Sequence, residues 1–356
     1  MFGSVILASI HMNNDNTKEK IMNKVTKLGA SALCGSLAAV SAANAGDLTV
    51  AGGIDMSWVS FPKEVTGNPI GIGSNYTLSG SGELDNGWGL ALSIAMKNKN
   101  IYSTTNVTVT VPAMGDIKIT QGGSGTGIDH YDDVTPNVWE EAYGVGLSNG
   151  INTVNGSAGG ASIEWKPNML PDGLEAYLAW TPNAAGATSN DLAYSGDSAR
   201  SGSGWDVALK ATDAITGMSG LTLYGGIANI DNNVVNDNGD QDETTVAITY
   251  AVGGFTLGYQ WSEEDLGASA KEQQYDNEGY GITFAINDDL SIGYNHYESK
   301  QTSTTNVTNE ATSVQIAYSM GGASIRLAQG DADNMDYNTG ATYDRDNTVV
   351  SIALAF

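Results

Sequence analysis

The stretch TVVSIALAF, residues 348–356, decides the fold class because its side chains alternate between two kinds. Val350, Ile352, Leu354 and Phe356 fall on one face of an extended chain, and mostly small or polar side chains fall on the other. Successive side chains of a strand point to opposite faces of its sheet. The stretch therefore predicts a β-strand with one apolar face and one small or polar face.

The same alternation recurs along the chain. Residues 246–250, 255–262 and 280–286 each place apolar side chains at every second position. No stretch after Ala45 is apolar enough and long enough for a transmembrane helix. Dyad repeats of about ten residues are typical of strands that cross the outer membrane. We therefore expect sixteen strands, at residues 47–59, 76–84, 88–98, 105–112, 116–122, 159–167, 173–181, 204–212, 221–230, 242–251, 255–264, 277–286, 290–300, 310–319, 323–331 and 346–356.

The connections between these strands support a closed barrel. Short connections are expected at residues 85–87, 113–115, 168–172, 213–220, 252–254, 287–289 and 320–322. The connections between them are mostly longer, polar and acidic, so that short and long ones alternate. An even-stranded barrel with short periplasmic turns and longer external loops requires this alternation. We therefore predict an all-β fold, a 16-stranded antiparallel transmembrane β-barrel.

Aromatic side chains fall near both ends of the expected strands. With the short turns on the periplasmic side, that rim would hold Trp88, Trp165, Tyr250, Phe255, Tyr318 and Phe356. The opposite rim would hold Trp58, Tyr76, Trp180, Trp205 and Trp261. The two interfaces of a lipid bilayer select aromatic side chains, so two such girdles favour a membrane barrel over a soluble sandwich.

The N-terminus has the pattern of a secretory signal. Lys24 and Lys27 precede an apolar stretch at 28–42, and residues 43–45 read Ala-Asn-Ala, an A-x-A cleavage site. We expect residues 1–45 to be an N-terminal extension and signal peptide cleaved after Ala45, and residues 46–356 to form the barrel. Translation could start at Met1, Met12 or Met22.

Charge and cysteine content exclude several classes of function. The chain has 15 Lys and Arg against 40 Asp and Glu, a net charge of −25. Nucleic-acid binding is not expected, because neutralising phosphates needs clustered cations. The single cysteine, Cys34, lies in the segment expected to be removed, which leaves no disulfide, thiolate nucleophile or cysteine metal site. The acidity instead favours a surface or pore that repels anions.

The longest connection, residues 123–158, combines apolar and acidic side chains. Its apolar residues, Trp139 and Tyr143 among them, could pack against a wall. Structureless connections of this length are usually functional or disordered. The candidate functional acids in it are Asp129, Asp132, Asp133, Glu140 and Glu141.

Two stretches resemble a known family. Residues 131–143, YDDVTPNVWEEAY, and residues 349–356, VVSIALAF, are similar to the third loop and the last strand of general bacterial porins, most closely those of Rhodobacter type. The resemblance implies a trimeric outer-membrane pore of a Gram-negative bacterium, in contact with outer-membrane lipid and lipopolysaccharide, that passes small hydrophilic solutes and ions. It further implies that the third loop folds inward as a constriction and that the assembly machinery reads Phe356.

In that family, the acids of the third loop face basic side chains on the wall. Strand parity places five basic residues on the inward face, namely Lys97, Lys118, Lys166, Lys210 and Arg326. Opposed charges across a narrow pore would order water and disfavour apolar solutes. Many of these porins present an arginine cluster, whereas this chain offers mostly scattered lysines. The excess of acid predicts a preference for cations, as rings of Asp and Glu produce in other channels.

Calcium is a weak candidate ligand of the external loops. Asp-, Asn- and Gly-rich sequence surrounds Asp231, Asp237, Asp240 and Asp242, and also Asp331, Asp333 and Asp336. Oxygen-rich loops suit Ca²⁺, but the EF-hand spacing is not met. We therefore expect solvated loops and no cofactor.

Three other functions stay open at this stage. A substrate-specific channel needs a file of aromatic side chains and paired charges along the lumen. Tyr177 and Tyr224 face inward by parity, but no continuous track is visible. A non-conducting adhesive or structural barrel would need longer external loops. An enzyme could use His130 beside Asp129 to activate water, but no serine has a nucleophile-elbow context, and we expect no enzyme.

Overall fold

The computed structural model describes residues 48–60, 68–98, 101–121, 125–146, 149–157, 161–184, 202–231, 239–267, 274–302 and 306–356. The predicted signal peptide, residues 1–45, lies outside the described residues, and so does its predicted cleavage site. No helix in the described ranges is long enough and apolar enough to cross a membrane.

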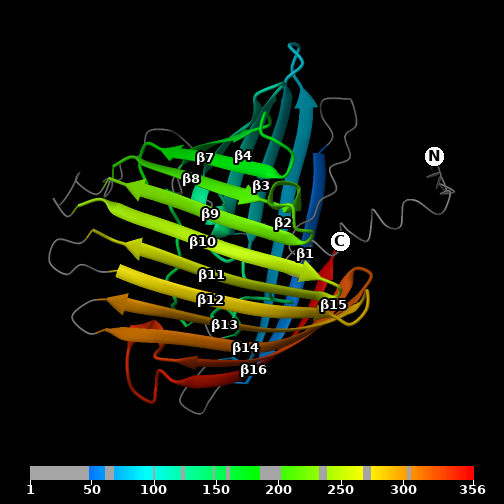
Figure 1. The fold of residues 1–356 in the computed structure, drawn as a ribbon. Helices are drawn as coiled ribbons and strands as arrows, with labels where there is room; N and C mark the ends of the chain where they lie inside the picture. Colours follow the sequence, from blue (N-terminus) through cyan, green and yellow to red (C-terminus); the bar gives the residue numbers. More distant parts are fainter. Residues whose placement is uncertain are drawn as a thin grey trace, which may run out of the picture.

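The described residues form a closed barrel of sixteen antiparallel strands (Figure 1). The strands are β1 (Leu48–Val59), β2 (Ile70–Glu83), β3 (Gly89–Lys97), β4 (Ile101–Val111), β5 (Gly115–Gln121), β6 (Ser162–Pro167), β7 (Leu174–Thr181), β8 (Gly204–Ala211), β9 (Leu221–Ile230), β10 (Gln241–Val252), β11 (Phe255–Asp265), β12 (Gln274–Ala285), β13 (Leu290–Thr302), β14 (Val307–Met320), β15 (Ala323–Asp333) and β16 (Arg345–Ala355). Within the described ranges, three short helices lie between them, η2 (Gly127–Tyr131), α2 (Asp213–Thr216) and η3 (Met335–Tyr337). The predicted fold class and all sixteen strands are confirmed.

The first and last strands close the barrel. β1 pairs with β16 from Gly53 opposite Ala355 to Val59 opposite Val349. Closure leaves none of these strands with an unpaired edge, which is the condition for a sheet to cross lipid. The predicted two-faced character of β16 is confirmed, since Ile352 is 40% exposed whereas Ser351 is fully buried.

The predicted alternation of short and long connections is wrong at two places. Residues 98–100 alone join β3 to β4, and residues 303–306 alone join β13 to β14. β4 begins at residue 101 rather than 105, and β2 begins at residue 70 rather than 76. In β2, Gly71 and Gly73 alternate with apolar residues, and glycine weakens a strand signal because it has no side chain to pack.

The aromatic rims are present with one correction. Trp180 and Trp205 lie opposite each other at the ends of β7 and β8 that are joined by the longer connection, and Phe255 stacks on Phe284 at the turn ends of β11 and β12, with ring centroids 4.4 Å apart. Tyr76 was expected at the external rim. It lies mid-strand opposite Gly52, because β2 begins earlier than predicted.

Candidate functional site: a loop held against the inner wall

The segment between β5 and β6 packs on side chains that face away from the exposed outer surface. Ile128 and Val154 form a buried cluster with Ala228 of β9. Val145 forms another with Ala328 of β15 and Val349 of β16. Because the outer face of these strands is the exposed apolar one, the segment lies on the inner face of the wall.

Amide side chains of the wall clamp the middle of this loop. The Val134 N–H donates to Gln260 Oε1 at 2.8 Å, and Gln260 Nε2 donates to the Tyr131 carbonyl at 2.7 Å. Gln315 accepts from the Trp139 N–H at 2.9 Å. Asn347 Nδ2 donates to the Val145 carbonyl, also at 2.9 Å. These bonds satisfy backbone groups that the loop buries, as folded proteins require.

Carboxylates of the wall hold the two ends of the loop. Glu164 of β6 accepts from the Gly127 N–H at 2.8 Å. Asp206 of β8 accepts from the Ser157 N–H at 3.0 Å, and Glu243 of β10 accepts from the Gly156 N–H at 2.7 Å. We call Glu164, Asp206 and Glu243 the anchor acids. Sequence parity places them inward, but nothing in the sequence pairs them with the loop.

A glycine of the wall gives the loop room to approach. A Cβ at Gly281 of β12 would lie 2.3 Å from the Pro136 carbonyl oxygen. Backbone therefore meets backbone at this point, and the loop lies closer to the wall than a side chain at this position would allow.

Asp129 and His130 lie at the start of the loop. Burial raises the pKa of Asp129, while a hydrogen bond from the Gly125 N–H and the nearby His130 oppose that rise. His130 Nε2 lies 2.9 Å from Glu164 Oε2, and its ring lies 4.2 Å from that of Tyr177. His130 thus contacts an anchor acid and an aromatic ring, which is the environment of a residue that fixes the loop.

Two pairs of adjacent acids occupy the middle of the loop. Desolvation, and then repulsion from Asp129, raises the pKa of Asp132 to about 7. Desolvation, and then repulsion from Asp132, raises the pKa of Asp133 to about 8. For Glu140, desolvation inside the barrel and a hydrogen bond with Glu141 raise the pKa to about 8. Burial also raises the pKa of Glu141, which accepts a 2.7 Å hydrogen bond from Asn137 Nδ2. We call Asp132, Asp133, Glu140 and Glu141 the tip acids.

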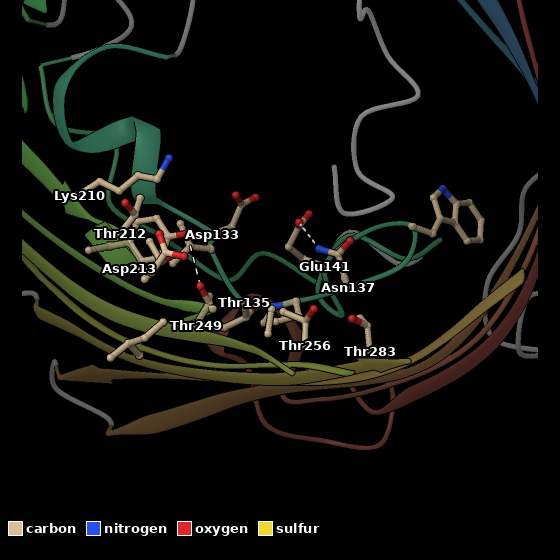
Figure 2. Close-up of a pocket in the computed structure, with 18 of the residues that line it drawn as sticks. Asp133, Thr135, Asn137, Glu141, Lys210, Thr212, Asp213, Thr249, Thr256 and Thr283 are labelled. Carbon is tan, nitrogen blue, oxygen red and sulfur yellow. Dashed lines mark hydrogen bonds between the residues drawn. The ribbon is translucent and has the colours of Figure 1, made fainter. Parts of the chain in front are cut away.

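A cavity of about 610 Å³ lies between the loop and strands β8 to β12. Asp133, Asn137, Glu140 and Glu141 border it from the loop. Figure 2 shows Asn137 and Glu141 joined by their hydrogen bond, with wall threonines on the neighbouring strands. The hydroxyl-bearing residues of the wall that border it are Thr212, Thr222, Thr249, Thr256 and Thr283.

Three of the five predicted wall cations form ion pairs with carboxylates of the wall. Lys166 and Lys210 share Glu175, at 2.9 and 3.2 Å. Arg326 pairs with Asp55, donates to Ser351 Oγ at 2.6 Å and lies over the Trp139 ring at 4.8 Å. Sequence parity did not identify Asp55 and Glu175 as partners, although both occupy inward positions.

The other two cations lie on β3 and β5, which β4 separates in the sheet, and they contact different groups. Lys118 donates to the Gly125 carbonyl at 2.6 Å, so it holds the start of the loop. Lys97 borders a smaller hollow of about 260 Å³ together with Asp55 and Arg326. The five cations therefore do not form one cluster.

The two aromatic residues that parity placed inward contact the loop. Tyr131 of η2 packs against Tyr224, with ring centroids 5.2 Å apart, and against Tyr177, at 6.2 Å. Tyr131 is only 4% exposed, so this cluster secures the loop rather than forming an open track along the pore.

The last residue sits at the seam of the barrel. Phe356 is 77% exposed, and its backbone exchanges hydrogen bonds with Gly52 of β1 at 3.0 and 3.1 Å. Its side chain is thus exposed at the end of the barrel that carries the short turns, which is compatible with recognition by assembly machinery, a role that stays a prediction.

The weak calcium candidates do not gather in the described part of the chain. Asp237 lies outside the described residues. Asp242 accepts a 2.8 Å hydrogen bond from Asn229. Within the described ranges, no group of three or more His, Cys, Asp or Glu residues is placed to hold a metal ion.

Comparisons with known proteins agree with this geometry. A family model described as Gram-negative porin matches residues 29–356. No curated protein matches the chain. Solved structures of similar fold include an anion-selective porin from Comamonas acidovorans, with 12% identity, 87% of this chain and 99% of that chain covered, and a TM-score of 0.60.

Two further solved structures share the fold. OmpT of Vibrio cholerae in its trimer form is 12% identical over 88% of this chain and 100% of that one, with a TM-score of 0.61. A mutant porin of Rh. blastica is 14% identical over 87% and 99%, with a TM-score of 0.54. The family model matches most of the chain, and the barrel has the strand number and closure of these structures. The chain therefore belongs to the Gram-negative porin family and is a multi-pass β-barrel of the outer membrane.

Proposed function

We propose that this porin is a general diffusion pore for small hydrophilic solutes and ions, and that it prefers cations. One observation carries the proposal: the described parts of the acidic loop, residues 125–146 and 149–157, pack on the inner wall and border a cavity of about 610 Å³. A loop in this position narrows the path of a solute, and its side chains set the chemistry of the narrowest part.

The balance of charge inside the barrel favours cations. The tip acids border the cavity or lie beside it. Lys166, Lys210 and Arg326, by contrast, each form an ion pair with a carboxylate of the wall. The net charge of −25 adds a field of the same sign. Negative side chains that line a water-filled path raise the local concentration of cations and lower that of anions. Anion selectivity is a property stated for the Comamonas acidovorans porin, and the charges of this chain argue for the reverse.

We also propose that three copies assemble and that the outer wall contacts outer-membrane lipid and lipopolysaccharide. The trimer is supported by the family resemblance and by the trimer form described for OmpT of Vibrio cholerae. Contact with lipid is supported by the apolar outer surface, on which Ile72 is 71% and Leu48 64% exposed. Such surface is stable only against an apolar solvent or a partner.

Planar-bilayer recording of the refolded protein tests the proposal. Ohmic current steps that occur in threes, with a reversal potential of cation-selective sign in a salt gradient, are expected. Well-folded, heat-modifiable protein that gives no conductance would overturn the diffusion pore. An anion-selective reversal potential would overturn the cation preference alone, and single uncorrelated steps would overturn the trimer.

A further inference from the structure

We propose that the connection between β15 and β16, residues 334–344, is a strap that clamps the second half of the inner loop and couples the mouth of the barrel to the pore. We call this connection the strap. The inference rests on the proposed diffusion pore, because it assigns a second element that sets the position of the narrowing loop. The strap contains η3 and lies at the mouth opposite the short turn that joins β14 to β15.

The base of the strap is packed into the barrel. Met335 of η3 is only 5% exposed and clusters with Ala332, an inward residue of β15. Asn334 Nδ2 donates to the Thr308 carbonyl of β14 at 2.9 Å. Residues 338–342, in contrast, are exposed. The strap is therefore fixed to the wall on one side and meets solvent at the mouth on the other.

Tyr337 connects the strap to the loop. The Asn152 N–H of the loop donates to the Tyr337 hydroxyl at 2.9 Å. The same hydroxyl lies 2.7 Å from Oγ of Ser299, a buried residue of β13. A phenolic hydroxyl both donates and accepts, so the two bonds form together. The Tyr337 ring packs against that of Tyr275 on β12, with centroids 5.1 Å apart. One side chain therefore joins two wall strands to the loop backbone.

The loop backbone at residues 149 and 150 is enclosed between the wall and η3. The Asp336 N–H of η3 donates to the Asn149 carbonyl at 2.8 Å, and Asn309 Nδ2 of β14 donates to the same carbonyl at 2.8 Å. Asn149 is fully buried. A Cβ at Gly150 would lie 2.1 Å from Asp336 Oδ1. The strap thus presses on the loop so closely that only glycine fits at this point.

The backbone of η3 has a conformation that its contacts must impose. Asn334, Asp336 and Tyr337 have φ values of 54°, 53° and 55°. Residues other than glycine rarely adopt this left-handed region, and a tyrosine there is an outlier. Such conformations persist only where the surrounding structure holds them. When the contacts with the loop are lost, η3 leaves this conformation. The strap therefore has two states, docked on the loop and released from it.

Release of the strap changes the pore through the loop. The docked strap holds residues 149–152, whereas the anchor acids hold residues 155–157 from the opposite side. Release leaves the second of these holds in place and removes the first, so the loop moves within the pore and the current fluctuates. The coupling between two sites is reciprocal. A change in the loop therefore also shifts the strap towards its released state.

A nitroxide spin label on the exposed part of the strap tests this coupling without any current. The label is placed at Thr339→Cys, with Cys34, the one cysteine of the chain, replaced by serine. Gly150→Ala on the loop is expected to raise the mobility of the label about three-fold. Gly125→Ala is the matched control, because Gly125 also has a positive φ and its Cβ would meet nothing nearer than 4.0 Å. Equal mobility in folded, heat-modifiable Gly150→Ala and Gly125→Ala would overturn the strap and leave the proposed function intact.

The reverse direction is read in planar bilayers. Tyr337→Phe keeps the ring and removes the hydroxyl that holds Asn152, and it is expected to raise the frequency of current fluctuations about ten-fold. Tyr318→Phe removes a hydroxyl from an exposed residue of the outer wall and is expected to leave the frequency unchanged. Wild-type fluctuations in folded Tyr337→Phe would overturn the strap. Absence of conductance in the wild type would instead overturn the proposed function, and the spin label would still decide the coupling.

Discussion

The anchor acids and the tip acids are the same residue types inside one barrel, yet their partners differ. Glu164, Asp206 and Glu243 accept hydrogen bonds from backbone N–H groups at the ends of the loop. The tip acids mainly face one another, and burial together with mutual repulsion raises the pKa of Asp133 and of Glu140 to about 8. Carboxylates with backbone donors hold structure together, whereas the raised pKa values of the tip acids mean that they gain their charge only as the pH rises.

The largest effect is expected from removing two anchor acids. Asp206→Ala with Glu243→Ala leaves the N–H groups of Asn155, Gly156 and Ser157 without their acceptors. Each buried donor left unpaired costs about 1–3 kcal/mol, so the loop should detach from the wall. Single-channel conductance should rise and become heterogeneous, and protease should cut the folded protein between residues 149 and 157. Wild-type conductance with full protease resistance would show that these acids do not hold the loop.

A smaller effect is expected from crowding the contact between loop and wall. Gly281→Ala places a Cβ 2.3 Å from the Pro136 carbonyl oxygen, so the loop tip must move. Such overpacking costs typically about 1–3 kcal/mol. Gly225→Ala is the matched control, because its Cβ would meet nothing nearer than 3.9 Å. The temperature of heat-modifiable migration should fall for Gly281→Ala and stay near the wild-type value for Gly225→Ala. Equal temperatures for both variants would contradict the close approach.

The tip acids should make selectivity depend on pH. A carboxyl group is neutral below its pKa and negative above it, and Asp132, Asp133 and Glu140 have pKa values raised to about 7, 8 and 8. At pH 6 these groups are mostly neutral, and at pH 9 they are mostly ionised. The cation selectivity read from the reversal potential should therefore increase from pH 6 to pH 9. A reversal potential that stays constant from pH 6 to pH 9 would show that other groups of the barrel set the selectivity.

The smallest effect is expected at the external acids that were weighed as calcium ligands. Asp242 contacts Asn229, and no metal-binding group forms in the described residues. Asp242→Asn should change the free energy of unfolding by less than about 0.5 kcal/mol, with or without Ca²⁺. A calcium-dependent stability that this substitution abolishes would restore the metal site.

The wall could be predicted from the sequence because its signal is local. An alternation such as that of residues 348–356 predicts which side chains face lipid, and a short turn between two strands predicts that they pair with each other. The start of β2 was missed where Gly71 and Gly73 replace the small or polar side chains of the pattern. The inward positions of Lys97, Lys118, Lys166, Lys210 and Arg326 also follow from the alternation.

The partners of the inward side chains could not be predicted, because they come from strands that are far apart in the sequence. Val134 and Gln260 are hydrogen-bonded across 126 residues, and Arg326 and Asp55 across 271. Parity says that a residue faces inward but not what lies opposite it. The anchor acids and the pairing of Lys210 with Glu175 therefore had no sequence signal beyond their inward position.

The reversal potential of a triple variant tests the central claim, that the tip acids set the selectivity of the pore. Asp133→Asn, Glu140→Gln and Glu141→Gln together remove the acids that border the cavity while the anchor acids stay in place. In a salt gradient at pH 9, the wild type should reverse at a cation-selective potential, and the triple variant should reverse near zero or with anion-selective sign. A folded triple variant that keeps the wild-type reversal potential would contradict the account.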